Sequence, residues 1–471
     1  MSPMAVDGSL ERLRREGRIV VVGASLAGLR AAETLREEGF TGTLTMIGDE
    51  PYEPYDRPPL SKQVLLGRVP ADHTALPRSR AIEAQWRLGA AATGLDPSAK
   101  RVALADGTSV EYDRLLIATG VRSRPWPNEL EAGLDGVFVL RTRDDATRLR
   151  HRLKAGPSRV LVIGAGFTGS EIASVCRERD LPVTVAERGP APLSGALGSV
   201  IGDVAAELQH QHGVDLRCGV MVTGLEGDGV GRLRRAHFSD GGTVDAEVAV
   251  VALGATRNTE WLAGSGLAAG PRGIACDAGC RAFDVRGIVA DDVFVAGDVA
   301  RSPHPLFGYR FLSLEHWGNA VAQAEVAAHN MICRAEERRP HLWTPYFWSA
   351  QFGVNIKSVG VPNMADQIIV SQGSLGEHRF TAAYGYQGRV IAAVTFDQAK
   401  WLEFYQRQIE QAAPFPPPFA TVDRRTEGMR PVPAGFPDPS VPTHGPQVTV
   451  SGYSPTDQRV TFTPAGHGRQ A

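Results

Sequence analysis

The sequence predicts an α/β fold in which two nucleotide-binding domains are followed by a smaller α+β domain and a proline-rich tail. Three observations support this prediction. A strand–turn–helix–strand unit opens the chain at residues 18–50, and a second such unit spans residues 159–189. Residues 345–396 show the alternating pattern of an antiparallel sheet. At 471 residues the chain is too long for one ordinary core, so we expect two to three domains.

The first unit begins with the apolar run RIVVVG, which is typical of a short buried strand. A tight glycine turn leads into a helix that we expect to end near Glu38, and TLTMIGDE then forms a second strand. Gly23 and Gly28 occupy the turn and packing positions of the dinucleotide-binding glycine motif. Ser25 replaces its middle glycine, and the serine hydroxyl can itself donate to a phosphate. We therefore predict a nucleotide site at this turn.

The second unit carries the complete glycine motif. Gly164 makes the turn, Gly166 lets the backbone approach a pyrophosphate, and Gly169 lets the helix pack against its strand. The positive end of the helix then holds the phosphates. Between the two units, residues 102–120 predict a hairpin with a DG turn and a further apolar strand. The chain thus contains a duplicated mononucleotide-binding unit of the Rossmann type.

Glu187 ends the strand that follows this complete motif, where an acid can bind the ribose hydroxyls of an adenosine. A carboxylate about 4 Å from a 2′-phosphate would cost up to ~4 kcal/mol at an effective dielectric constant of about 20. We therefore expect NADH to be preferred over NADPH. Arg188 follows directly and would reduce this preference.

The remaining elements complete the predicted fold. The run DVFVAGD predicts a short strand, and a helix is expected from Glu315. After the antiparallel sheet, residues 398–413 predict a closing helix. The tail beyond Ala413 is too rich in Pro and Gly to form a domain, although QVTVSG and QRVTFTP can form short strands laid on the body of the protein.

Composition argues against several classes of function. A net charge of −2 offers no electrostatic case for nucleic acid, and no apolar run approaches the ~18–20 residues of a membrane span. The polar N-terminus lacks the apolar core of a signal peptide, so we expect a cytoplasmic protein. The five cysteines include no C-x-x-C pair, so we expect no metal site; a redox or metal role for Cys276 and Cys280 is a weaker alternative.

A series of motifs in a fixed order resembles one enzyme family. These motifs are IVVVGASLAGLRAAE, YDRPPLSK at 55–62, LLIATG at 115–120, the complete glycine motif, VFVAGDVA at 293–300, EHWGNA at 315–320 and YFWSAQFG at 346–353. Their order and spacing resemble the FAD-dependent ferredoxin reductases that serve bacterial cytochrome P450 and Rieske-type oxygenase systems. The resemblance covers residues 18 to about 418.

The resemblance implies a division into five segments. They are a first FAD-binding part at 1–124, an NAD-binding domain at 125–254, a second FAD-binding part at 255–330, a C-terminal α+β domain at 331–420 and the proline-rich tail at 421–471.

The resemblance also assigns cofactor contacts, with the first glycine turn on the FAD pyrophosphate and Asp298 on the ribityl chain. The expected cofactor-binding residues are Gly23, Ala24, Ser25, Ala27, Gly28, Asp49, Glu50, Arg57, Lys62, Ala92, Thr119, Gly120, Arg141, Gly297, Asp298, Glu315, His316, Trp317, Trp348, Gly164, Gly166, Phe167, Gly169, Glu171, Glu187 and Gly254. The alternative is structural: Asp298 caps a turn, and Trp317 and Trp348 are core aromatics.

Lys62 and Glu171 are the expected catalytic pair. In the family pattern they meet where the nicotinamide stacks on the flavin, and they act by position and charge because hydride transfer needs no general base. The alternative is a loop lysine and a first-turn glutamate with no joint role.

Two departures from the family pattern bear on its implications. Arg257 stands where the family often has proline, so the hinge between domains is expected to differ. Ala350 stands where an acidic residue is common, which bears on partner choice or flavin potential.

The expected function is therefore an NADH-dependent FAD reductase that supplies electrons to a small [2Fe–2S] ferredoxin, as a monomer or homodimer. Thiol-dependent flavoenzymes are excluded, because residues 49–100 contain no cysteine. Two alternatives stay open: direct reduction of oxygen, a quinone or another small molecule, and a binding protein of the apoptosis-inducing-factor type that NADH switches.

Overall fold

The computed structural model describes residues 3–78, 82–417, 431–436, 447–451 and 459–463. The FAD-type domain is built on a six-stranded sheet, in the order β20 (Arg281–Phe283), β21 (Val289–Val295), β7 (Arg114–Ile117), β1 (Arg18–Val22), β2 (Thr43–Gly48) and β3 (Gln85–Leu88). Strands β1, β2, β3, β7 and β21 run parallel, so residues 289–295 return to complete a sheet begun at residue 18.

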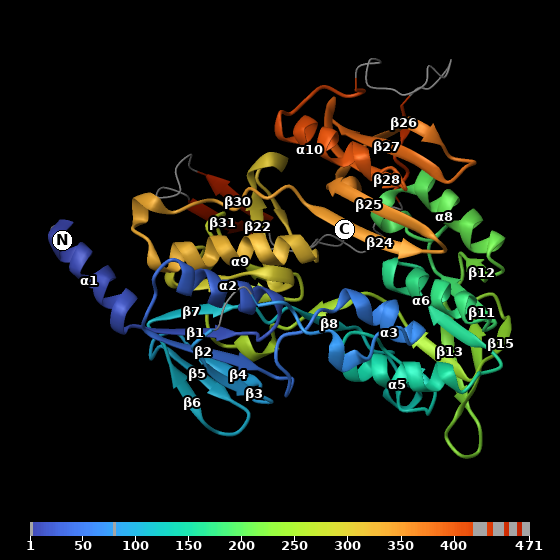
Figure 1. The fold of residues 1–471 in the computed structure, drawn as a ribbon, viewed down its shortest axis with the longest axis horizontal. Coiled ribbons are helices and arrows are strands. Elements are labelled where there is room, and N and C mark those ends of the chain that lie inside the picture. The colour runs from blue at the N-terminus through green and yellow to red at the C-terminus, as the bar shows by residue number, and fades with distance from the viewer. Residues whose placement is uncertain (1–2, 79–81, 418–430, 437–446, 452–458, 464–471) are drawn as a thin grey trace, which may run out of the picture.

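Two layers cover this sheet (Figure 1). Helices α2 (Leu26–Glu37) and α9 (Trp317–Ile332) pack along each other and share one apolar core with the sheet. Strands β4 (Ala92–Asp96), β5 (Arg101–Leu104) and β6 (Ser109–Glu111) form the predicted hairpin region against a second core. Helix α1 (Pro3–Glu16) precedes the first strand and was not predicted.

The NAD-type domain contains a parallel sheet in the order β12 (Asp215–Cys218), β11 (Val183–Glu187), β10 (Val160–Ile163), β16 (Val248–Val251) and β9 (Val137–Phe138). Its main helices are α5 (Arg143–Lys154), α6 (Phe167–Glu178) and α8 (Ser199–Gln211). An antiparallel sheet of β13 (Val222–Gly227), β14 (Leu233–Phe238) and β15 (Thr243–Asp245) lies beside it. Both strand–turn–helix units form as predicted.

The chain crosses between these domains twice, and the crossings pair with each other. Strand β8 (Val121–Ser123) leaves the first domain, and β17 (Ala255–Arg257) returns antiparallel beside it. Gly120 and Gly254, one residue before each crossing, have positive φ angles of 62° and 82°, a conformation that favours glycine. The two crossings form a short, two-stranded connection between the domains, which we call the hinge.

The C-terminal domain is the predicted antiparallel sheet. Its order is β24 (Tyr346–Gln351), β25 (Val354–Gly360), β28 (Arg389–Phe396), β27 (Arg379–Tyr386), β26 (Gln367–Ser374) and β29 (Val432–Pro433), with α10 (Leu402–Glu410) packed against it. The sheet contacts the NAD-type domain, where the buried Tyr384 hydroxyl donates to the Leu197 carbonyl at 2.6 Å. Shorter elements are α3 (Gln63–Leu66), α4 (Glu129–Ala132), α7 (Ser194–Leu197), β18 (Ala269–Gly270), β19 (Gly273–Ala275), β22 (Ala300–His304) and β23 (Arg310–Leu312).

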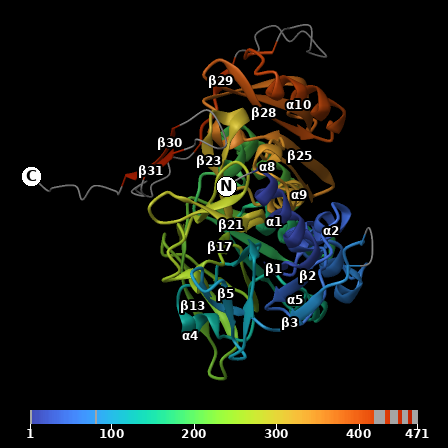
Figure 2. The ribbon, with the colours of Figure 1, turned by 90° about the vertical axis from the view of Figure 1, so that its left-hand side faces the viewer.

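Part of the tail joins this sheet. Strand β29 pairs with β26, and the buried Ala434 bridges two domains: its N–H donates to Asp366, and its carbonyl accepts from Ser199 at the start of α8. Strands β30 (Gln447–Ser451) and β31 (Arg459–Thr463) form the two strands predicted in the tail. They pair with each other as a separate hairpin, which Figure 2 shows to one side of the main sheets.

The fold class is confirmed, with shifts at element boundaries. The closing helix expected over residues 398–413 is the shorter α10, Leu402–Glu410, preceded by a 3-10 turn at Ala399–Trp401. The helix expected from Glu315 begins at Trp317, because His316 has an extended backbone and forms the N-cap. The domain boundaries at individual residue numbers stay a prediction. Within the described parts of the chain, no helix is both long and apolar enough to cross a lipid bilayer.

Candidate cofactor and hydride-transfer site

Two adjoining cavities lie at the carboxyl ends of the parallel strands, the usual ligand position in open α/β sheets. The larger, about 310 Å³, and the smaller, about 130 Å³, share lining residues that include Ser25, Arg57 and Gly120. Most of the predicted cofactor-binding residues line one or both cavities: Gly23, Ala24, Ser25, Ala27, Asp49, Glu50, Arg57, Lys62, Thr119, Gly120, Arg141, Phe167, Glu171, Gly297, Asp298, Glu315, Trp317 and Trp348.

The first glycine turn has the geometry that its motif predicts. Gly23 has a φ of 121°, and a Cβ there would lie 2.1 Å from the Ala118 carbonyl oxygen. A Cβ on Gly28 would lie 2.0 Å from the Gly23 oxygen, so this position sets the packing of α2 against β1. Ser25 is the N-cap residue of α2, but its hydroxyl does not cap the helix. That hydroxyl therefore remains able to donate to a bound phosphate.

The second glycine turn separates two roles. A Cβ on Gly169 would lie 1.9 Å from the Gly164 oxygen, so a side chain there clashes within the protein itself. Gly166, the N-cap residue of α6, has no neighbouring atom within 4 Å of the same Cβ position among the described residues. The backbone at Gly166 therefore faces open space, from which a diphosphate can approach the helix N-terminus.

Glu187 lies beside this turn, and its carboxylate already accepts hydrogen bonds from the protein backbone. One carboxylate oxygen accepts from the Ala165 N–H at 2.7 Å, and the other accepts from the Gly189 N–H at 2.6 Å. A carboxylate offers about four acceptor positions, so each oxygen retains room for a ribose hydroxyl. Glu187 therefore shapes the turn as well as presenting a negative charge to it.

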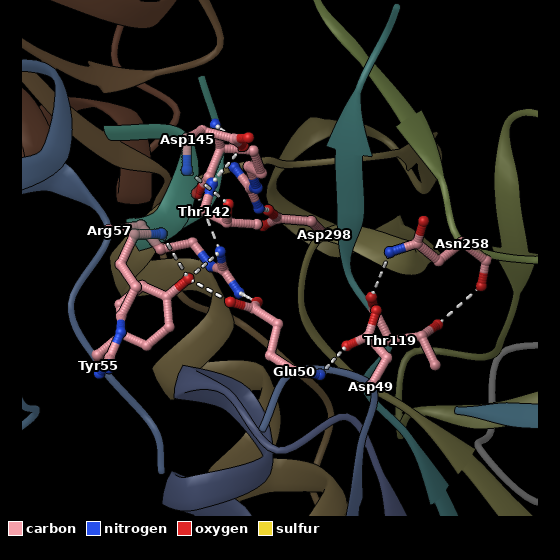
Figure 3. Close-up of polar contacts among 11 residues, drawn as sticks. Asp49, Glu50, Tyr55, Arg57, Thr119, Thr142, Asp145, Asn258 and Asp298 are labelled. Carbon is pink, nitrogen blue, oxygen red and sulfur yellow. Dashed lines mark hydrogen bonds and ion pairs between the residues drawn. The ribbon is translucent and has the colours of Figure 1, made fainter. Parts of the chain in front are cut away.

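The adenosine side of the first domain is organised around Arg57 (Figure 3). Its guanidinium pairs with Glu50 at 2.6 Å and also donates to the Tyr55 hydroxyl and the Arg141 carbonyl. Tyr55 in turn donates to Glu50 at 2.5 Å, and burial raises the pKa of that phenol. Asp49 accepts only from the Glu50 N–H among the contacts drawn, so it is the freer of the two acids predicted for the ribose.

Arg141 and Asp298 meet across the larger cavity at 3.0 Å, although they lie 157 positions apart in the sequence. The Nε of Arg141 is buried without a hydrogen-bond partner in the described structure. A buried donor left unpaired costs about 1–3 kcal/mol, so a ligand oxygen at this position would relieve that cost. The first turn can hold a dinucleotide, because the Arg141 Nε and the Ser25 hydroxyl are both free to donate to it. The second turn can hold another, because Gly166 leaves its backbone open.

The predicted catalytic pair is in direct contact. Lys62 Nζ lies 2.7 Å from a Glu171 carboxylate oxygen, and both side chains are largely buried. Glu171 also accepts from Ser61 at 2.5 Å and from Ser349 at 2.6 Å. Its carboxylate, on helix α6 of the NAD-type domain, thus joins the loop after β2 to strand β24 of the C-terminal domain. The loop lysine and the first-turn glutamate are therefore in contact, and their joint role in catalysis stays a prediction.

The two predicted tryptophans also come together. The rings of Trp317 and Trp348 lie 6.3 Å apart in an edge-to-face arrangement, and both line the larger cavity. Trp348 is 40% exposed, so it connects that cavity with the surface. The Trp317 indole N–H donates to Asp56 at 2.9 Å, which holds its ring in place. Burial raises the pKa of Asp56.

Other predicted residues have roles outside the cavities. Ala92 lies at the start of β4, packed against the core that contains Val22 and Ile47, and does not line either cavity. His316 caps α9, and burial lowers the pKa of its ring to about 4, which keeps it neutral at physiological pH. Gly254 lies at the second crossing of the hinge.

Sequence reasoning missed four supporting residues. Tyr55, Asp56 and Ser61 stand within YDRPPLSK, and Ser349 stands within YFWSAQFG. Each hydrogen-bonds to a predicted residue from elsewhere in the chain or from the same loop. The motifs themselves held the signal, since polar residues inside a cofactor motif are candidates to hold its contacting side chains.

Comparison with known proteins bears on this site. Residues 17–324 match the pyridine nucleotide-disulphide oxidoreductase family, and residues 346–427 match the C-terminal domain of reductases. The chain belongs to this oxidoreductase family. Its membership implies FAD and NADH as cofactors. The C-terminal reductase match and the ferredoxin reductases among its relatives confirm the resemblance recognised in the motifs. The match to the C-terminal reductase domain ends at residue 427, before the tail segment that forms β29.

The chain is also similar to individual proteins of known name, among them two relatives and one solved structure. The ferredoxin–NAD(+) reductase component of the anthranilate 1,2-dioxygenase system of Burkholderia cepacia is 35% identical over 84% of this chain and 94% of its own length. Human apoptosis-inducing factor 3 is 32% identical over 80% of this chain and 60% of its own length. A covalent putidaredoxin reductase–putidaredoxin complex matches with a TM-score of 0.79 and 29% identity, covering 85% of this chain and 94% of that one.

Proposed function

We propose that this protein is an FAD-dependent reductase that moves electrons from NADH to a small [2Fe–2S] ferredoxin, which in turn serves a cytochrome P450 or Rieske-type oxygenase. The observation that carries the proposal is the larger cavity, which is lined by both the Lys62–Glu171 pair and the partly exposed Trp348. One end of this cavity faces the NAD-binding turn through α6, and the other opens to the surface beside the C-terminal sheet.

Bound FAD supplies chemistry that the side chains lack, because a flavin accepts two electrons together and releases them singly. The chain's own residues provide binding and orientation. The first glycine turn and Arg57 would hold the dinucleotide, and Arg141 with Asp298 would hold its middle. Lys62 and Glu171 would orient the nicotinamide, and Trp317 with Trp348 would wall the side from which electrons leave.

A rapid-mixing experiment tests the acceptor. The protein is reduced with NADH and then mixed with a [2Fe–2S] ferredoxin from the same organism or with air-saturated buffer or a free quinone. We expect at least one ferredoxin to reoxidise the flavin far faster than oxygen or quinone. Equal rates would contradict the ferredoxin assignment and favour direct reduction of a small molecule.

One alternative is a binding protein of the apoptosis-inducing-factor type that NADH switches, and the chain is similar in sequence to apoptosis-inducing factor 3. We propose a cytoplasmic reductase that works as a monomer or homodimer without such a switch. Size measurement with and without NADH separates the two, because only the switched protein should change its oligomeric state when NADH is added.

Cofactor preference gives a separate prediction. NADH should exceed NADPH in kcat/KM by roughly tens of fold. This ratio corresponds to a repulsion of roughly 2–3 kcal/mol between the Glu187 carboxylate and the 2′-phosphate of NADPH, which is below the upper value of ~4 kcal/mol. Glu187→Gln removes the charge and should narrow this ratio about fivefold or more. The substitution also disturbs the Ala165 and Gly189 contacts, but that disturbance affects both cofactors alike, so the ratio is the informative quantity. Equal use of both cofactors by the unaltered protein would contradict the argument.

A further inference from the structure

Arg257 connects the hinge to the cofactor cavity. It is the last residue of β17, where the chain returns from the NAD-type domain, and it pairs in register with Val121 of β8. Its guanidinium lies 2.7 Å from the Glu315 carboxylate, with the arginine side chain only 17% exposed. This ion pair therefore ties the crossing strand to the residue that precedes the N-cap of α9.

Glu315 lines the larger cavity together with Phe167, Thr168 and Glu171 of helix α6. The N-terminus of α6 is the predicted diphosphate site, so a nicotinamide attached to that diphosphate would enter this part of the cavity. Nicotinamide carries a carboxamide whose N–H groups need acceptors when they leave water. An ionised carboxylate accepts such hydrogen bonds more strongly than a neutral carboxyl group does.

The groups around Glu315 have opposing effects on the pKa of its carboxyl. Burial raises the pKa of this carboxyl, the cation of Arg257 opposes that rise, Asp298 adds to it, and Arg141 opposes it. These groups face Glu315 from β17, from the turn after β21 and from the segment before α5. His316 adds no charge near neutral pH, since burial lowers the pKa of its ring to about 4.

Stability alone is a poor account of Arg257. Its Nε is buried without a hydrogen-bond partner in the described structure, so the guanidinium is desolvated and only partly satisfied. Such burial generally costs as much as the ion pair returns. The effect of Arg257 on Glu315 is therefore a better account of this buried ion pair than its contribution to stability.

We propose that Arg257 is a positioning residue that keeps Glu315 ionised and held toward the cavity, so that its carboxylate accepts from the nicotinamide carboxamide. This inference rests on the proposed use of NADH. It gives Arg257 a part in cofactor binding as well as in the connection between the domains.

The test measures the Kd of NAD⁺ for the FAD-loaded protein between about pH 6 and about pH 9, where no turnover occurs. For the unaltered protein we expect little change in Kd over this range. Arg257→Met should raise the pKa of Glu315 further, so that the carboxyl is protonated at the acidic end. Its Kd should be about tenfold weaker near pH 6 and should recover as the pH rises, because deprotonation restores the acceptor.

Three further variants make the result specific. Arg257→Lys retains the cation and should keep the flat profile. Glu315→Gln cannot ionise, so its Kd should be weak at every pH, and adding Arg257→Met to it should weaken binding no further. Arg235→Met removes an ion pair of the same 2.7 Å length, made with Asp245 on the antiparallel sheet that contains β14, and should leave the Kd and its pH profile unchanged.

If Arg257→Met weakened NAD⁺ binding by the same factor at all pH values, the inference would be overturned. Loss of FAD from both Arg257 variants would overturn it as well. If Arg257→Met alone loses FAD, a Glu315→Gln variant that binds NAD⁺ normally overturns it as well, and one with weak, pH-independent binding supports it. Failure of the unaltered protein to bind NAD⁺ would instead contradict the proposed function. Because no ferredoxin enters these measurements, a wrong acceptor assignment leaves them unaffected.

Discussion

Glu171→Gln is expected to slow reduction of the bound flavin by NADH about a hundredfold while the protein retains its FAD. The magnitude is that of removing one preorganised polar contact from a reaction site. Glutamine preserves the size of the side chain and one acceptor oxygen, but it removes the negative charge that faces Lys62 at 2.7 Å. Single-turnover reduction by NADH, followed through the flavin absorbance, gives the rate directly.

The contacts of Glu171 explain why its effect should fall on the rate. Ser61, Lys62 and Ser349 bring three separate segments to this one carboxylate, so its charge fixes where the lysine ammonium lies. The residue belongs to α6 of the NAD-type domain and not to the first glycine turn, so we expect the variant to retain FAD. Its role is to orient the nicotinamide, for which small misplacements are costly.

A control on the same helix is available. Glu178 ends α6 and forms an exposed ion pair with Arg68, so Glu178→Gln makes the same chemical change at the surface. Exposed pairs contribute about 0–1 kcal/mol, and this variant should reduce its flavin at the normal rate. If Glu171→Gln lost FAD but its remaining loaded fraction reacted normally, the Lys62–Glu171 pair would be structural.

The features predicted correctly are those that local sequence determines. Buried strands such as RIVVVG, the DG hairpin and both glycine turns follow from periodicity and from the conformations that only glycine adopts readily. The Lys62–Glu171 contact is not local, and it was predicted only because the resemblance to a family placed the two residues together. Their side chains meet within hydrogen-bonding distance in the structure.

The features missed depend on contacts between distant segments. Nothing in the local pattern shows that Trp317 donates to Asp56, 261 positions away, or that Arg257 reaches Glu315. The pairing of β29 with β26 was missed for the same reason, since a two-residue strand in a proline-rich tail has no periodicity of its own. Helix α1 is polar on most of its surface, so the usual apolar pattern of a packed helix is weak there.

Gly166→Ala should raise the KM for NADH by about a hundredfold without lowering the melting temperature of the protein. The new Cβ meets no described atom within 4 Å, so the free protein accommodates it. The same methyl group would stand where the diphosphate must approach the amides at the start of α6. Loss of that approach removes charge-assisted hydrogen bonds, each of which contributes about 1.5–3 kcal/mol. Steady-state kinetics and thermal unfolding of the FAD-loaded protein measure both quantities.

Gly169→Ala, three residues on, is the matched comparison. Its Cβ would lie 1.9 Å from the Gly164 oxygen, so this variant should lower the melting temperature because α6 must move away from its strand. The first turn provides a second comparison, since Ser25 already carries a side chain at the position equivalent to Gly166. Only the second turn should therefore require a bare backbone at this position. A Gly166→Ala protein with normal KM would show that the diphosphate binds elsewhere, and one with a lowered melting temperature would show that Gly166 is structural.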